Sequence, residues 1–79
     1  MSPAASSVQL DLLAREVLAA NLVRLRAERG WSQETLALQA GLHRTFVAHV
    51  ERQARNISLD NLERLALALN VPPYKLLKA

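Results

Sequence analysis

The sequence contains no cysteine, only two glycines in 79 residues, and no proline between Pro3 and Pro72. The lack of cysteine excludes disulfide bonds and thiolate metal sites. Scarce glycine and proline, with abundant leucine and alanine, favour helices over a turn-rich β-sandwich. No apolar run reaches the roughly 20 residues of a membrane-spanning helix, and the N-terminus does not resemble a secretory signal. We therefore expect a cytoplasmic, single-domain protein without a membrane span.

Hydrophobic residues make up 51% of the chain and charged residues 22%, which is typical of a chain that folds. From Val8 to Arg29 apolar residues recur every three or four positions, the spacing of one helix face. Ser7 is the expected N-cap of this long helix, and Gly30 is its expected end. We predict a flexible N-terminus over residues 1–7 and one domain over residues 8–79.

Four shorter helices are expected after Gly30. Ser32 and Ser58 are placed to cap two of them, whereas Gly41, Asn70 and Pro72 are placed to end helices. The predicted ranges are 33–40, 44–52, 59–69 and a last short helix, 73–77, that opens at a proline. The sequence thus predicts an all-α fold of five helices with short connections and an extended first helix.

The segment from Gln33 to Arg52 holds two short helices joined at Gly41. Glycine tolerates a positive φ, and the small Ala37 lets two helices cross steeply. This pattern resembles the helix-turn-helix of the phage-repressor and Cro superfamily, also called the XRE family, over roughly residues 22–77. The stretches 41–46, 50–52 and 55–59 are most similar to controller proteins of restriction-modification systems. Departures occur at Ala48-His49 and at Gln53, where glycine is common.

The resemblance implies that the second helix of the motif lies in the major groove of operator DNA. Arg44 can donate two parallel hydrogen bonds to guanine, and Thr45 can offer its methyl group to thymine. A solvated arginine and a local backbone hydrogen bond of the threonine are the structural alternatives. The residues expected to contact bases are Arg44, Thr45, Ala48 and His49.

Phosphate contacts are expected from positions that flank the recognition helix. His43 can contact a phosphate or cap the helix, and neither it nor His49 belongs to a metal-ligand set. Residues 43–58 contain three arginines and one glutamate, so they carry a net charge of +2 out of the chain's +3. A solvated charged loop is the alternative. The expected phosphate-contacting residues are Gln33, His43, Arg52, Arg55 and Asn56.

Glu51 would repel phosphates if it faced DNA, so we expect it to point inward. The family resemblance implies an ion pair between Arg26 and Glu51, which sets geometry more than stability. Trp31 is expected to pack as an anchor beneath residues 33–40. Phe46 is expected to be a half-buried support for the recognition helix.

Specific operator binding by this fold requires two recognition helices, which implies a homodimer. The C-terminal tail carries more apolar surface than one short helix hides, and the family places the partner contact there and on residues 59–69. Core packing of the tail is the alternative, and Leu12 and Val23 of the first helix form a second candidate surface. The expected interface residues are Val71, Tyr74, Leu76 and Leu77.

The leading functional interpretation is a dimeric, sequence-specific transcriptional regulator that resembles controller proteins and regulates its own gene. The sequence has no cysteine, no glycine-rich phosphate loop and no convergent acid–base set that would indicate an enzyme, and no cofactor or metal is expected. One rival is an antitoxin of the same fold that binds a toxin, with DNA binding secondary. Another is a helical interaction module that has lost DNA binding. The sequence leaves activation versus repression, and a contact with RNA polymerase, open.

Overall fold

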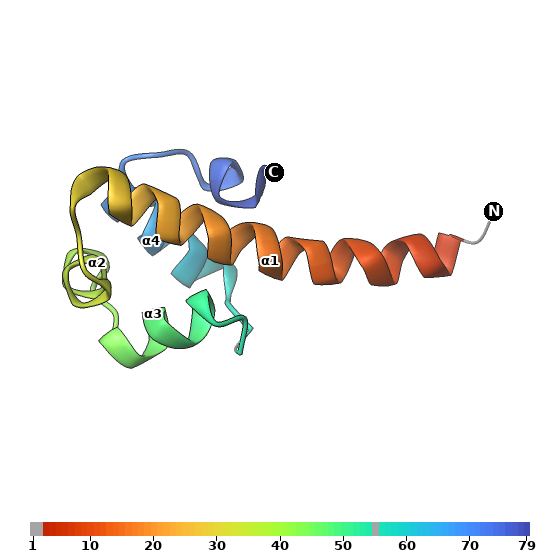
Figure 1. Cartoon of the computed structure of the whole chain (residues 1–79), viewed down its shortest axis with the longest axis horizontal. Helices are drawn as coiled ribbons and strands as arrows, with labels where there is room; N and C mark the ends of the chain where they lie inside the picture. Colours follow the sequence, from red (N-terminus) through yellow and green to blue (C-terminus); the bar gives the residue numbers. More distant parts are fainter. Residues whose placement is uncertain (1–2, 55) are drawn as a thin grey trace.

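A computed structural model describes residues 3–54 and 56–79, with side chains from Ala14 onward. Its elements are α1 (Pro3–Arg29), α2 (Gln33–Ala40), α3 (Arg44–Glu51), α4 (Leu59–Leu69) and the 3-10 helix η1 (Pro73–Leu77). The described part of the chain is all-helical and has no strand (Figure 1). No helix in it is long and apolar enough to cross a membrane.

Two sequence predictions about the elements need correction. The chain has four α-helices in its described residues, because the expected fifth helix is a 3-10 turn of only five residues. A helical segment of only five residues readily adopts 3-10 geometry. The first helix begins at Pro3, five residues before the expected Val8, so Ser7 does not stand at its N-terminus.

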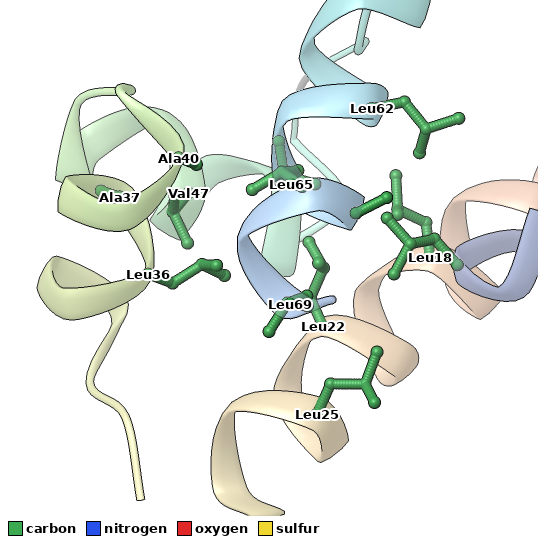
Figure 2. Packing of buried hydrophobic residues seen from close by; sticks show 13 residues of the cluster. Leu18, Leu22, Leu25, Leu36, Ala37, Ala40, Val47, Leu62, Leu65 and Leu69 are labelled. Atoms are coloured by element: carbon green, nitrogen blue, oxygen red, sulfur yellow. The ribbon is translucent and has the colours of Figure 1, made fainter. Parts of the chain in front are cut away.

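The core lies between all five elements, with α3 packed against α1 and α2, and η1 packed against α1 and α4. Figure 2 shows leucines from α1, α2 and α4 pointing toward one another. The side chains buried most completely come from all five elements: Leu22, Leu36, Val47, Leu65, Leu69 and Leu76. Because α3 contributes Val47 and Val50 to this core, its opposite side is left facing solvent.

Local capping sets the bounds of α2 and α4 as the sequence predicts. The hydroxyl oxygens of Ser32 and Ser58 accept hydrogen bonds from the backbone N–H groups of Thr35 and Asn61, at 3.0 and 3.1 Å. Gly41 and Asn70 take the left-handed conformation at the C-terminal ends, with φ of 70° and 58°. These four residues confirm the predicted starts and ends of the two helices.

α3 ends one residue earlier than predicted, in a turn that places Gln53 at a φ of 60°. The N–H of Ala54 donates to the carbonyl of His49 at 2.9 Å, and the N–H of Gln53 donates to that of Val50 at 3.0 Å. This hydrogen-bond pattern usually has glycine at the left-handed position, because a Cβ is strained there. Gln53 therefore carries local strain at the end of α3.

We expect Gln53→Gly to raise the free energy of unfolding by about 0.5–1 kcal/mol, since relief of left-handed strain outweighs the added freedom of the unfolded chain. Gln53→Ala is the matched control: it also removes the side chain but keeps the strained Cβ, so it should not stabilise the protein. Urea unfolding followed by circular dichroism measures both variants. Equal stabilisation by glycine and alanine would point to the side chain instead of the backbone.

Candidate nucleic-acid interface

The outward side of α3 carries the four residues expected to contact bases. Arg44 and Thr45 are exposed in the first turn, and Ala48 and His49 are half-buried one turn later. A shallow hollow runs between them and the start of α2. It is lined by Ser32, Gln33, Glu34, Arg44, Thr45 and Ala48. The fold thus brings an expected phosphate-contacting residue, Gln33, next to the expected recognition surface.

Arg44 is held by a partner that the sequence did not suggest. Its Nη1 donates to the Oε2 of Glu34 at 2.9 Å, and about 70% of each side chain is exposed. Exposed pairs of this kind contribute little to stability, about 0–1 kcal/mol. The Glu34 carboxylate is therefore an easily displaced partner of the Arg44 guanidinium.

A buried network behind this surface joins α1, α2 and α3. Arg26 donates from Nε and Nη2 to the two carboxylate oxygens of Glu51, at 2.6 and 2.8 Å, and from Nη1 to the carbonyl of Trp31 at 2.8 Å. The Glu51 side chain is only 4% exposed. Arg26 and Glu51 thus form the ion pair that the family resemblance implies, and Glu51 points inward.

The hydrogen bonds to Glu51, together with its charge, raise the pKa of Arg26 above the ordinary arginine value despite the opposing effect of burial. Because the pKa of Arg26 is raised in the folded protein, its ion pair with Glu51 stabilises the fold fully at any pH below the ordinary arginine pKa. This stabilisation is lost only as the pH rises through the pKa of Arg26 in the folded protein. Arg26 therefore adds no pH dependence near neutrality.

Gln33 also belongs to this network. Its side chain was expected to contact a phosphate instead. Its Nε2 donates to Oε1 of Glu51 at 2.8 Å, so the amide that was expected to reach a phosphate already has a partner. Gln33 nevertheless opens α2, where helix N–H groups favour an anion. Trp31 and Phe46 are both partly buried against the core, where the sequence placed them.

The remaining expected phosphate contacts lie at the two ends of α3. His43 is exposed at the N-cap position, and its side chain makes no capping hydrogen bond. Arg52 is exposed just after α3, whereas Arg55 lies outside the described residues. Asn56 accepts a hydrogen bond from the guanidinium of Arg15 in α1, a contact across 41 positions that local sequence patterns do not reveal. No group of metal-ligating side chains occurs in the described part of the chain.

The prediction that Leu76 lies in a dimer interface is wrong. Leu76 has no exposed surface, because η1 turns it into the core of its own chain, so it cannot contact a partner. Tyr74 and Leu77 of η1 stay exposed, at 63% and 45%, and Val71 is half-buried. The outer side of α4 adds two exposed leucines, Leu59 and Leu67.

Asn21 explains how η1 is held and was not singled out from the sequence. Its Nδ2 donates to the carbonyls of Lys75, Leu76 and Lys78 at 3.2, 2.9 and 3.0 Å, and its Oδ1 accepts from Arg24. Like the Glu51 side chain, Asn21 is buried, with 8% of the residue exposed. An asparagine within a helix gives no local pattern that would indicate this clamp.

Comparison with known proteins agrees with this geometry. A family model described as helix-turn-helix matches residues 22–76. A hypothetical transcription factor of Neisseria meningitidis is 54% identical over 63 residues, which cover 80% of this chain and 59% of that protein. The control protein C.BamHI of Bacillus amyloliquefaciens is 52% identical over 46 residues, which cover 58% and 57%. The matched segments thus span less than two thirds of either relative.

Among solved structures, the restriction-modification controller protein C.AhdI from Aeromonas hydrophila superposes with a TM-score of 0.75. The two are 45% identical, and the match covers 78% of this chain and 94% of that one.

Proposed function

This chain belongs to the helix-turn-helix family of the phage-repressor (XRE) type, and on that premise we propose that it is a non-catalytic, sequence-specific transcriptional regulator. The observation that carries the proposal is the exposed outer side of α3, whose inner side is anchored by Val47 and Val50. In this fold such a helix enters the major groove. Residues 8–79 would carry both DNA binding and dimerisation, in the cytoplasmic compartment that holds the DNA.

Base readout is assigned to the first two turns of α3. Arg44 leaves Glu34 and donates two hydrogen bonds to guanine, and Thr45, Ala48 and His49 contact neighbouring base edges. Phosphate contacts come from the start of α2 at Gln33, from His43, and from Arg52, Arg55 and Asn56 after α3. The concentration of positive charge in residues 43–58 supports this assignment.

Operator specificity in this fold needs two recognition helices about 34 Å apart, so we propose a homodimer. Val71, Tyr74 and Leu77 form its interface, together with the exposed leucines of α4. The similarity to C.BamHI and C.AhdI supports a controller-like, autoregulatory role. The antitoxin alternative gains no support from these relatives.

Titration of operator-containing and scrambled DNA, followed by fluorescence anisotropy at two salt concentrations, tests this proposal. The DNA upstream of the protein's own gene is the first operator candidate. We expect a preference of about a thousandfold or more for that DNA, with affinity falling steeply as salt rises. Weak and equal binding to both DNAs would contradict the proposed function.

Arg44→Ala and Arg52→Ala should affect binding differently. Arg44→Ala should reduce the preference for operator over scrambled DNA by about 1–3 kcal/mol. Arg52→Ala should weaken binding to both DNAs equally and lower the salt slope by about one. Lys78→Ala, which removes an exposed positive charge outside α2 and α3, is the control for charge alone. Similar losses of preference in the first two variants would refute the division between base and phosphate contacts.

A further inference from the structure

One arginine of α1 interrupts the apolar series on the side of the helix that faces the core. Leu18, Leu22 and Leu25 follow one another at helical spacing, and all three are buried. Arg15 continues this series toward the N-terminus, three positions before Leu18, but its side chain is exposed. Figure 1 shows that α1 continues past the end of α3. The side of α1 that faces the core therefore changes from leucine to arginine at the edge of the core.

At this edge Arg15 lies beside the segment that follows α3. Its Nη2 donates a hydrogen bond to Oδ1 of Asn56. Arg15, Gln53 and Asn56 line the same shallow hollow, together with Leu18 and Val50. The last two belong to the core and pack α1 against α3. Buried packing thus places Arg15 next to the C-terminal end of the proposed recognition helix.

The hydrogen bond from Arg15 determines which end of the Asn56 side chain is left for a ligand. Arginine has only donors, so the amide presents its oxygen, Oδ1, to the guanidinium. The Nδ2 group of Asn56 is exposed and has no acceptor among the described residues. A phosphate oxygen accepts hydrogen bonds from such donors. The contact with α1 therefore orients Asn56 as a donor toward a ligand.

Arg15 also brings a positive charge to this position. None of the ion pairs in the described part of the chain includes Arg15. Its guanidinium uses one N–H on Asn56, and its other N–H groups remain available for a phosphate. Residues 43–58 carry a net charge of +2, to which Arg15 adds from a distant part of the sequence. Charge and an oriented amide thus meet at one exposed place.

We propose that Arg15 and Asn56 together bind one phosphate of the DNA backbone. This inference rests on the proposed DNA-binding function and adds to it a residue outside the segment that matches the helix-turn-helix family, residues 22–76. Arg15 supplies the charge and fixes the amide, and Nδ2 of Asn56 donates to the same phosphate. A phosphate contact carries no base information, so it strengthens binding to operator and scrambled DNA equally.

Arg15→Met and Lys78→Met in the full chain form a matched pair that tests this inference. Each removes one exposed positive charge and introduces the same side chain, but only Arg15 contacts Asn56. Fluorescence anisotropy measures binding to both DNAs at about 50 and 200 mM salt. Loss of one phosphate contact lowers the salt slope by about 0.9 for each bound copy of the chain. The affinity of Arg15→Met should therefore fall about threefold less than that of wild type between the two salt concentrations. Lys78→Met should behave as wild type.

Two further variants separate the charge of Arg15 from its effect on the amide. Arg15→Lys keeps the charge, so its salt slope should equal that of wild type. Asn56→Ala should weaken binding to both DNAs, and it should do so less in the Arg15→Met background, where the amide is no longer oriented. Equal losses in the two backgrounds would contradict a shared phosphate site.

An unchanged salt slope in Arg15→Met, or the same change in Lys78→Met, would overturn the contact. Weaker binding by Arg15→Met with an unchanged slope would show that Arg15 only supports the segment after α3. Circular dichroism and thermal unfolding check that Arg15→Met keeps the wild-type fold, as expected for an exposed position. The outcome is separable from the proposed function. Equal binding of wild type to operator and scrambled DNA defeats that function, whereas an operator preference with an unchanged slope in Arg15→Met defeats only the phosphate contact.

Discussion

Glu51→Gln should lower the free energy of unfolding by on the order of 3 kcal/mol, because it leaves the Arg26 charge behind α3 without its counter-ion. The carboxylate accepts hydrogen bonds from Arg26 and Gln33, and an amide provides only one acceptor oxygen for them. Domains have total stabilities of about 5–15 kcal/mol, so the loss is a large share. Thermal and urea unfolding measure it.

Glu34→Gln is the matched control for this prediction. It makes the same substitution in another arginine–carboxylate pair, but the Glu34 side chain is 70% exposed whereas that of Glu51 is 4% exposed. We expect Glu34→Gln to change the free energy of unfolding by no more than about 1 kcal/mol. Similar losses in the two variants would show that burial does not set the strength of the Arg26–Glu51 pair.

The double variant Arg26→Met/Glu51→Leu separates loss of charge from loss of packing. Removal of both charges leaves no unpaired ion, so much of the stability lost in Glu51→Gln should return. Operator binding need not return with it, because the hydrogen bonds from α1 and α2 that orient α3 are gone. A stable double variant with wild-type operator preference would show that the network is not needed to position α3.

The second large effect is expected at Asn21, which holds η1 in place. Asn21→Asp replaces a donor with a carboxylate that faces the backbone carbonyls of Lys75, Leu76 and Lys78. Loss of the hydrogen bonds, together with burial of the new charge, should lower the free energy of unfolding by about 3 kcal/mol. Asn21→Ala should lower it by about 1–3 kcal/mol, since it removes the bonds without adding charge.

Asn56→Asp is the control, because Asn56 is exposed and already acts as an acceptor toward Arg15. Its effect on stability should stay within about 0.5 kcal/mol. Hydrogen exchange locates the damage: backbone amides of residues 74–77 should exchange faster in Asn21→Asp than in wild type, relative to those of α4. Uniform acceleration across the chain would indicate that Asn21 supports the whole core equally instead of holding η1.

Helix bounds were predictable wherever they depend on neighbouring residues. Ser32 and Ser58 cap through hydrogen bonds to N–H groups three residues away, and Gly41 and Asn70 end helices through their own backbone conformation. Such interactions are encoded within a few positions. The exposed outer side of α3 was predictable for a similar reason, because helix periodicity separates Val47 and Val50 from Arg44 and Thr45.

The pair of Arg26 and Glu51 joins positions 25 apart, so only the family resemblance indicated it. The sequence by itself thus determined the all-helical class, the caps of α2 and α4 and the exposed outer side of α3. The tertiary structure alone decided that Asn21 clamps η1, that Leu76 is buried, that Arg44 pairs with Glu34 and that Arg15 reaches Asn56. The hydrogen bonds join residues that are 10 to 57 positions apart, and the burial of Leu76 depends on which side η1 presents to the core. Neither property follows from local spacing.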